Sequence, residues 1–296
     1  MRGATAPESC CSGAGPPASG TSRHDGAARQ PTPTRAWTLA VTLVLALAAG
    51  CADRGREPAT PALGASAPTT ATTTPAAASK PCLEPAEQEK LFRFRTRDGA
   101  TLVGLVLGSG REGLVVGHQL GSDLCEWVPQ ARAFARRGYQ VLAFDFAGFG
   151  DSEHGSGDDR VDTDVVAAVE QLRRRGVDRV VLVGSSMGGT AVLSAATRIR
   201  PPVAGVVSLS GPSGFGGVDA QGAMARLRVP VLFVVAADDQ HFTEQARVMY
   251  RAARVHHKRL LVIPGGGHGT GLLEFGEDAA RVRAAVRGFI ADRTRA

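Results

Sequence analysis

The sequence contains very little lysine. Of its 34 basic residues, only Lys80, Lys90 and Lys258 are lysines, and the others are arginines. The formal net charge is +6, yet no basic cluster is interleaved with aromatic residues. Such clusters are the usual footprint of nucleic-acid-binding proteins, so the sequence argues against that class of partner.

Long hydrophobic runs are also missing from the N-terminal part. The first 80 residues hold a single apolar run, from Trp37 to Gly50, preceded by Arg35. A membrane-spanning helix needs about 20 apolar residues, whereas the apolar region of a signal peptide needs only about 7 to 15. The run therefore favours a signal for export over a membrane span.

The apolar run ends in Leu47-Ala48-Ala49-Gly50-Cys51, which resembles the lipobox of bacterial lipoproteins. In those proteins the cysteine is acylated and the chain is cut just before it. The resemblance implies a signal peptide over residues 1–50 and a lipid-bearing N-terminus at Cys51. The protein would then be anchored to the outer face of the membrane. Plain secretion and an uncleaved signal anchor remain the alternatives.

Residues 51–80 are rich in Ala, Pro and Thr and have almost no hydrophobic bulk. Such a segment cannot offset the entropy of ordering, so we expect a disordered tether. Residues 81–296 then form one folded domain with two cysteines, Cys82 and Cys125. In an exported protein such a pair favours one disulfide, and two buried free thiols are the alternative.

Short β-branched runs alternate with amphipathic runs through the folded part. We expect strands at residues 92–96, 102–107, 114–116, 141–144, 180–183, 203–209, 231–235 and 260–263, and helices at 127–137, 159–175, 187–198, 244–253 and 278–292. Asp98-Gly99 favours a hairpin between the first two strands, and the buried character of the others favours parallel pairing. The predicted fold class is α/β, with an eight-stranded, mostly parallel sheet covered by helices on both faces.

One pentapeptide carries the strongest chemical signal. Gly184-Ser185-Ser186-Met187-Gly188 follows the apolar run at 180–183 directly and precedes an Ala-rich helical stretch. A serine at such a sharp strand-to-helix turn is pushed above the sheet, and the helix N-terminus behind it favours an oxyanion. Ser186 is therefore the predicted nucleophile.

A serine nucleophile needs a base to take its proton and an acid to orient the base. The strand at 231–235 runs into Ala236-Ala237-Asp238-Asp239, and Asp239 is the predicted acid with Asp238 as the alternative. The base is predicted to be His268, which stands in a glycine-rich loop after the last strand.

The order of these motifs, from Leu91 to Ile290, resembles that of the α/β-hydrolase family. The resemblance implies that the loop beginning at His118 supplies an oxyanion donor, the backbone N–H of Leu120, paired with that of Met187. Gln119 is the fallback, because it stands where the family often has Gly. Small relatives with little lid, similar to the dienelactone hydrolase group, use Cys as the nucleophile, whereas this chain has Ser.

The predicted function follows from the resemblance and the triad together. We expect a serine hydrolase that cleaves a carboxylic ester or thioester through an acyl-enzyme, with no cofactor and no metal. Only 20 residues separate Ser210 from Val231, which leaves room for little or no lid and favours small soluble esters or an acylated envelope molecule. A peptidase or acyltransferase of the same fold and a non-catalytic envelope lipoprotein are the alternatives.

Overall fold

The computed structural model describes residues 80–155 and 160–295, which lie in one compact unit of the chain. The expected signal peptide over residues 1–50, the lipidation site at Cys51 and the tether up to residue 79 lie outside the described residues, so they stay predictions. Among the residues that are described, no helix combines the length and the apolar character that crossing a membrane would require.

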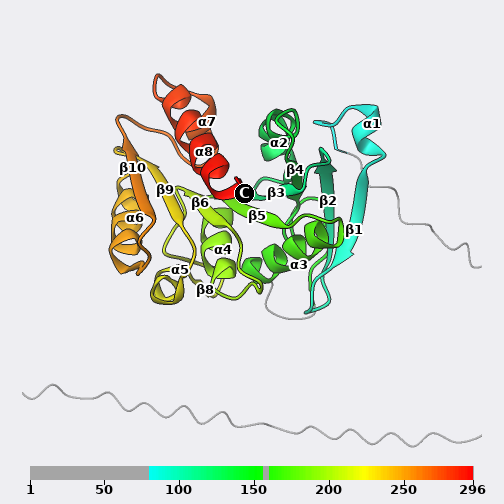
Figure 1. Cartoon of the computed structure of the whole chain (residues 1–296), viewed down its shortest axis with the longest axis horizontal. Helices are drawn as coiled ribbons and strands as arrows, with labels where there is room; N and C mark the ends of the chain where they lie inside the picture. Colours follow the sequence, from blue (N-terminus) through cyan, green and yellow to red (C-terminus); the bar gives the residue numbers. More distant parts are fainter. Residues whose placement is uncertain (1–79, 156–159, 296) are drawn as a thin grey trace, which may run out of the picture. The chain divides into compact units, whose positions relative to one another are not determined.

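The centre of the domain is an eight-stranded sheet in the order β1-β2-β4-β3-β5-β6-β9-β10 (Figure 1). The strands are β1 (Leu91–Arg95), β2 (Thr101–Leu107), β3 (Glu112–Gly117), β4 (Gln140–Phe144), β5 (Arg179–Ser185), β6 (Gly205–Leu209), β9 (Val231–Ala236) and β10 (Lys258–Ile263). β2 is antiparallel to both of its neighbours, and the six strands from β4 to β10 along the sheet are parallel. The predicted fold class is confirmed.

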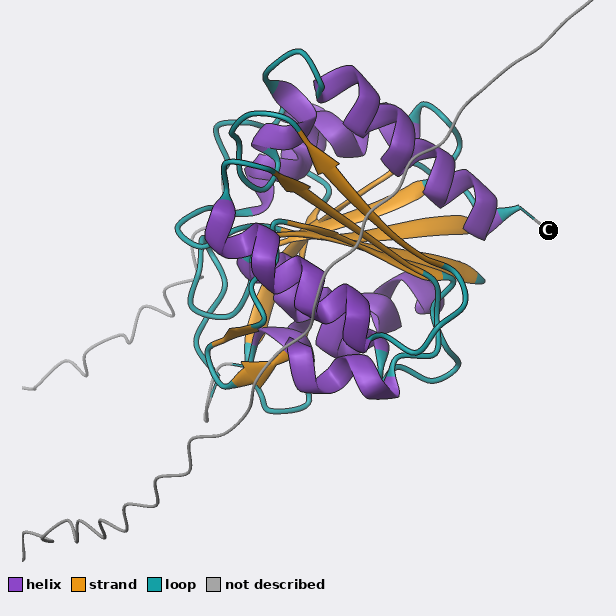
Figure 2. Cartoon of the chain, turned by 90° about the vertical axis from the view of Figure 1, so that its left-hand side faces the viewer, coloured by secondary structure: helices purple, strands orange, loops and turns teal. Residues whose placement is uncertain are grey.

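Helices cover both faces of the sheet, which Figure 2 shows nearly edge-on. They are α1 (Pro85–Gln88), α2 (Val128–Ala135), α3 (Val161–Arg174), α4 (Met187–Ala196), α5 (Ala220–Ala223), α6 (Gln240–Ala252), α7 (Gly271–Glu274) and α8 (Ala279–Thr294), with 3₁₀ turns η1 (Leu124–Trp127) and η2 (Met224–Arg226). In Figure 1, α2, α7 and α8 lie along one side of the sheet and α3, α4 and α5 along the other.

Two hydrophobic clusters form the core, one on each face of the sheet. Successive residues of a strand point to opposite faces, so Val180 and Leu182 of β5 join one cluster while Val181 and Val183 join the other. All four side chains are at most 1% exposed. The continuous apolar runs in the sequence are therefore strands that are buried on both sides.

The segment between β6 and β9, where a lid could be inserted, is short. It contains the two-residue strands β7 (Gly214–Phe215) and β8 (Val218–Asp219), followed by α5 and η2. This agrees with the expectation of little or no cap. The small β7–β8 ladder was not predicted, because two residues are too few to show a period.

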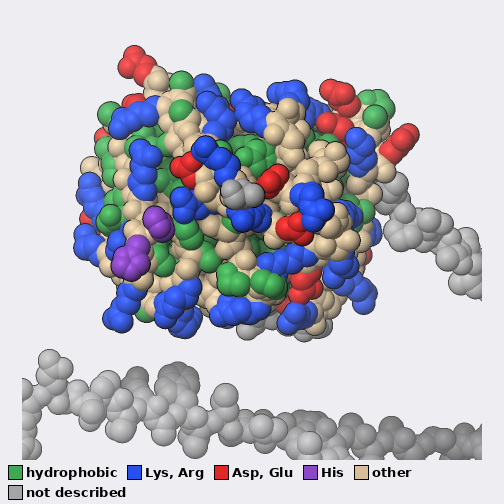
Figure 3. Space-filling model, viewed as in Figure 1, with side chains coloured by type: hydrophobic (Ala, Val, Ile, Leu, Met, Phe, Trp, Pro, Cys, Tyr) green, Lys and Arg blue, Asp and Glu red, His purple; other side chains and the backbone are tan. Residues whose placement is uncertain are grey.

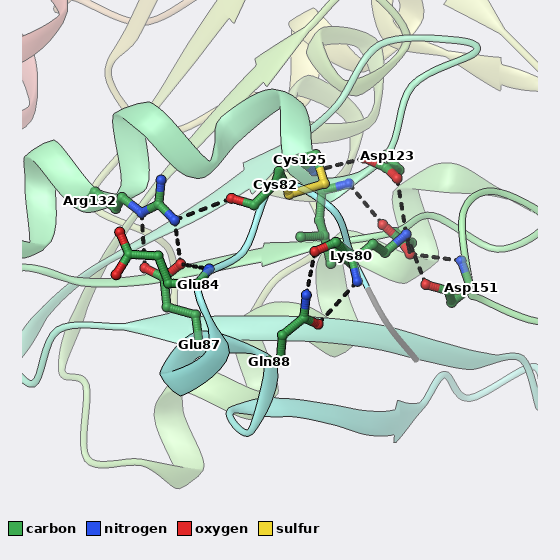
Figure 4. The surroundings of a disulfide bond; sticks show 11 residues. Lys80, Cys82, Glu84, Glu87, Gln88, Asp123, Cys125, Arg132 and Asp151 are labelled. Carbon is green, nitrogen blue, oxygen red and sulfur yellow. Dashed lines mark hydrogen bonds and ion pairs between the residues drawn. A yellow bond between two sulfur atoms is a disulfide. The ribbon is translucent and has the colours of Figure 1, made fainter. Parts of the chain in front are cut away.

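A strap at the start of the domain, Lys80–Gln88, is fastened to η1 and α2 (Figure 4). Cys82 and Cys125 are joined by a disulfide, and Arg132 of α2 forms an ion pair with Glu87. Lys80, which the composition assigned to the end of the tether, is buried in the domain with an exposure of 3%.

The Lys80 ammonium lies among three carboxylates. Its Nζ is 3.0 Å from Asp123, 2.8 Å from Asp145 and 3.0 Å from Asp151. Burial alone would lower the pKa of Lys80, but these acidic partners, Asp145 above all, outweigh it and raise that pKa. Asp145 is fully buried and also accepts hydrogen bonds from the backbone of Leu124 and Asp151, so its role is structural.

Figure 3 shows Lys and Arg side chains spread over most of one face of the domain. Several of the arginines pair with nearby acids, for example Arg97 with Glu170 at 2.7 Å. On this face the positive charge is therefore dispersed over the surface.

Candidate active site

Ser186 lies at the turn between β5 and α4 in a strained backbone conformation. Its φ is 48° and its ψ is −115°, a region that non-glycine residues rarely adopt. Its backbone N–H donates to the carbonyl of Leu209 at the end of the neighbouring strand β6, at 2.8 Å. This turn has the geometry of a nucleophile elbow, in which strain presents the side chain above the edge of the sheet. The strained turn agrees with the strand-to-helix turn that the sequence predicts, and the role of Ser186 as the nucleophile stays a prediction.

The glycines of the pentapeptide allow the elbow to close. A Cβ at Gly184 would lie 2.2 Å from the carbonyl oxygen of Gly188. A Cβ at Gly188 would lie 2.3 Å from the carbonyl oxygen of Gly117. Both separations are well inside contact distance, so any side chain at either position would push α4 away from β3 and β5.

His268 and Asp239 lie together at the same edge of the sheet. The Nδ1 of His268 is 2.7 Å from a carboxylate oxygen of Asp239, and both side chains are half-buried. An ionised carboxylate holds the proton on Nδ1, which leaves Nε2 free to act as a base. The backbone N–H of the alternative acid, Asp238, donates to Gly265, and its exposed side chain has no hydrogen bond with His268 among the described residues.

α6 starts earlier than the sequence predicts, and this places its first turn next to His268. The helix begins at Gln240, four residues before the predicted start, and its first turn is fixed by Thr243, whose Oγ1 donates to Ala236 at 2.5 Å. That turn brings the ring of Phe242 to 4.4 Å from the ring of His268. The imidazole is therefore held by a carboxylate on one side and by a ring on the other.

The base loop also meets the elbow. A Cβ on Gly269 would lie 3.3 Å from the Cβ of Ser185, so the residue after His268 touches the residue before Ser186. Among the described residues no hydrogen bond joins Ser186 to His268. In enzymes without a bound substrate this bond is often long, and it shortens when the substrate is in place.

The loop after β3 contains both of the backbone N–H groups considered as oxyanion donors, those of Gln119 and Leu120. The N–H of Gln119 donates to Glu126 at 2.9 Å, whereas those of Leu120 and Met187 have no partner among the described residues. The carbonyl of Gln119 accepts a hydrogen bond from Nδ1 of His118 at 2.8 Å. In a trans peptide the C=O and the following N–H point in opposite directions, so this bond turns the N–H of Leu120 away from His118. The geometry thus favours Leu120 over Gln119 as the oxyanion donor.

His118 is buried and neutral. It is 0% exposed, and its Nε2 accepts a hydrogen bond from the backbone of Phe146 at 3.1 Å, which assigns the proton to Nδ1. Burial lowers the pKa of His118, because desolvation disfavours the charged ring. Its function here is to fix the loop.

Glu126 is a residue of the site that the sequence did not reveal. It lies in η1, and its carboxylate accepts hydrogen bonds from the backbone of Gln119 and from the hydroxyl of Ser185. Burial raises the pKa of Glu126, and hydrogen bonds from Ser185, Gln119, Ser122 and Thr270 oppose that rise. In the sequence Glu126 is one polar residue before a helix, and only folding brings these distant donors together.

Two further residues near the site, Trp127 and Ser210, have structural roles. Trp127 is 1% exposed and donates from its indole to the carbonyl of Gly117 at 2.9 Å. Ser210, at the end of β6, is a second strained residue with a φ of 49°, and no sequence signal identified it. No group of three or more His, Cys, Asp or Glu side chains within the described ranges is arranged to hold a metal ion.

Comparisons with known proteins agree with this architecture. Residues 114–226 match the family of the alpha/beta hydrolase fold, a stretch that includes Ser186 and ends before Asp239. The 2-hydroxy-6-oxononadienedioate/2-hydroxy-6-oxononatrienedioate hydrolases of Burkholderia vietnamiensis and Paraburkholderia phymatum are 35% and 34% identical over 114 residues. Each match covers 36% of this chain, and the chain spans 38% of the length of these relatives.

Solved structures show the same fold over most of the domain. An esterase from Pyrococcus furiosus superposes with a TM-score of 0.61 at 17% identity, over 70% of this chain and 91% of that one. A monoacylglycerol lipase from Paleococcus ferrophilus gives 0.57 at 17% identity, over 69% and 99%. An esterase from Exiguobacterium antarcticum gives 0.57 at 14% identity, over 68% and 99%. The chain has the α/β-hydrolase fold.

Proposed function

We propose that the protein is a serine hydrolase that cleaves carboxylic esters or thioesters through an acyl-enzyme. One observation carries the proposal: a strained Ser186 at a strand-to-helix turn shares the sheet edge with His268, which is held 2.7 Å from Asp239. A buried structural serine would need neither the strain nor an oriented imidazole beside it.

In the proposed reaction, Nε2 of His268 takes the proton of Ser186 as Oγ attacks the carbonyl carbon of the ester. The N–H groups of Leu120 and Met187 stabilise the resulting oxyanion, and each such donor contributes about 10²- to 10³-fold to turnover. His268 then gives the proton to the departing alcohol. A water molecule activated by the same imidazole attacks the acyl-enzyme, and the acid leaves from Ser186.

The substrate class is proposed from the open setting of the site. The segment between β6 and β9 holds only short elements, α5 among them, so little covers the catalytic edge. Small soluble esters, or acyl groups carried on a larger envelope molecule, fit such a site. The matched relatives are named as hydrolases of 2-hydroxy-6-oxo-dienedioates, which adds that class of substrate to those worth testing.

Labelling with a fluorophosphonate probe tests the proposal directly. We expect the folded protein to be labelled and Ser186→Ala to remain unlabelled, with Ser109→Ala, at an exposed serine between β2 and β3, as the matched control. Hydrolysis of p-nitrophenyl esters of increasing acyl length, against peptide amides and with an added alcohol acceptor, separates esterase from peptidase and acyltransferase. A folded protein that the probe does not label would refute the proposed function.

The proposed location is the cell envelope, with a lipid anchor on Cys51 and no nucleic-acid partner. This part of the proposal is supported by the sequence around Cys51 alone, since that residue lies outside the described part of the chain. Loss of membrane association in Cys51→Ala, with esterase activity retained in the released protein, is the expected result.

A further inference from the structure

The two peptide units that meet at Gln119 are both held by hydrogen bonds. On one side the N–H of Gln119 donates to Glu126 at 2.9 Å. On the other side the carbonyl of Gln119 accepts from His118 at 2.8 Å and from the backbone N–H of Ser122 at 3.2 Å. The N–H of Leu120 shares a planar peptide unit with the carbonyl of Gln119, so His118 and Ser122 fix its direction directly. Glu126 holds the preceding peptide unit, and with both units held the backbone of Gln119 cannot rotate freely between them.

Glu126 makes contacts beyond this loop. The hydroxyl of Ser185, the residue before the nucleophile, donates to its other carboxylate oxygen. The side chain of Thr270, two residues after His268, also favours the charged form of this carboxylate and so opposes the rise in the pKa of Glu126. One side chain thus joins the oxyanion loop, the elbow and the base loop, which come from three separate parts of the chain.

Burying a carboxylate costs free energy, and for Glu126 burial is the largest influence on its pKa, which it raises. A carboxylate accepts hydrogen bonds and cannot donate one, so the ionised form fits the ring of donors around it. A partly buried carboxylate with a shifted pKa, set against the candidate reacting groups, is typical of functional positions.

We propose that Glu126 is a positioning residue for the hydrolytic reaction. Its carboxylate fixes the peptide unit before Gln119, which limits how the next unit, with the Leu120 N–H, can turn, and it ties this loop to the elbow through Ser185 with Thr270 of the base loop close by. This inference rests on the proposed function, and it adds a residue that acts through the oxyanion donor without touching the substrate.

The segment that carries Glu126 is itself held firmly. η1 is capped by Asp123, whose carboxylate accepts from the backbone of Cys125 at 2.8 Å and pairs with Lys80. Cys125 is tied to the strap by the disulfide with Cys82, as Figure 4 shows. The residue before Glu126 is therefore cross-linked to another part of the chain, which limits how far the carboxylate can move.

Two substitutions distinguish the positioning role of Glu126 from the effect of its negative charge. Glu126→Met fills nearly the same space but cannot accept from Gln119. In Glu126→Gln the amide oxygen can still accept from Gln119, and the amide nitrogen can donate to the hydroxyl of Ser185, which can rotate to accept. Glu274→Met, at an exposed carboxylate of α7 beyond the base loop, is the matched control.

We expect Glu126→Met to lower kcat by about 10- to 100-fold, measured per active site titrated with the fluorophosphonate, because a donor displaced by about 1 Å loses most of its effect. KM should stay within about threefold of the wild-type value, because the ground state is bound as before. The affinity for a trifluoromethyl ketone, whose adduct places an oxyanion in the same hole, should fall by the same factor as kcat. Glu126→Gln should restore kcat to within about fivefold of wild type.

Several outcomes would overturn the inference. The inference is refuted if Glu126→Met keeps the wild-type kcat and the wild-type affinity for the ketone. It is also refuted if Glu126→Gln loses as much kcat as Glu126→Met. If Glu126→Met does not fold, Glu126→Asp, which withdraws the carboxylate by one methylene, should show the same loss of kcat, and wild-type turnover there would count against positioning. Failure of the wild type to react with the probe would instead refute the proposed function, so the two failures are distinct.

Discussion

Removing the Cys82–Cys125 cross-link should destabilise the domain strongly. The disulfide closes a loop with a sequence separation of 43 residues. In the chain-entropy description, closing a loop of this length restricts the unfolded chain by an amount worth about 4 kcal/mol at 25 °C. For a domain of this size, each kcal/mol shifts the melting temperature by about 2–4 °C, so we expect a fall of about 8–16 °C.

The test is thermal unfolding of Cys82→Ala/Cys125→Ala, followed by circular dichroism. Wild-type protein treated with a phosphine reductant should melt near the temperature of the double variant, because both lack the cross-link. The double variant itself should not respond to the reductant, which controls for effects of the reagent. A double variant that melts within about 2 °C of the oxidised wild type would refute the reasoning, since that shift corresponds to less than about 1 kcal/mol.

Three further predictions concern the site. Asp239→Asn should lower kcat by up to about 10⁴-fold, because the imidazole loses the partner that holds its tautomer, whereas Asp238→Asn should remain near wild type in the same ester assay. Gly188→Ala should abolish labelling by the fluorophosphonate, since its Cβ would lie 2.3 Å from the carbonyl that ends β3; Gly266→Ala, where a Cβ meets nothing within 4 Å, is the control. Burial lowers the pKa of His118 in the folded protein, so the unfolded chain binds the proton more readily. Stability is therefore lost as the pH falls below the pKa that this histidine has in the unfolded chain. Urea unfolding should show a loss of up to about 1 kcal/mol between pH 6.5 and 5.5 that is absent in His118→Gln, and equal losses in the two proteins would contradict the assignment.

The sequence was sufficient for the sheet and the elbow because their signals are local. The four residues before Gly184 form an apolar run, and the helix after Met187 begins where the pattern changes. The hairpin at Asp98-Gly99 and the crossover helices were equally accessible, to within a few residues at each end. Boundaries such as the start of α6 differ, because the first turn of this helix is fixed by the hydrogen bond from Thr243 to Ala236, which helical periodicity does not reveal.

Parts of the site could not be read from the sequence because they depend on direction in space. Asp238 and Asp239 are adjacent in one loop, and only the fold determines which carboxylate faces His268. The choice between Gln119 and Leu120 likewise depends on how one peptide plane is turned. Glu126 has no sequence signal at all, since its partners Ser185 and Thr270 are 59 and 144 residues away.

The base stands in the loop that follows the last strand, and this has a consequence for how the chain gains activity. β10 pairs only with β9, at the edge of the sheet, and α8 must still pack after it. The elbow can form once β5 and its neighbours are in place, but Ser186 has no base until the C-terminal part of the chain has added to the sheet. During refolding, the reactivity of Ser186 toward a fluorophosphonate should therefore appear later than the bulk of the secondary structure. Covalent labelling would then report the time at which the final step of folding occurs.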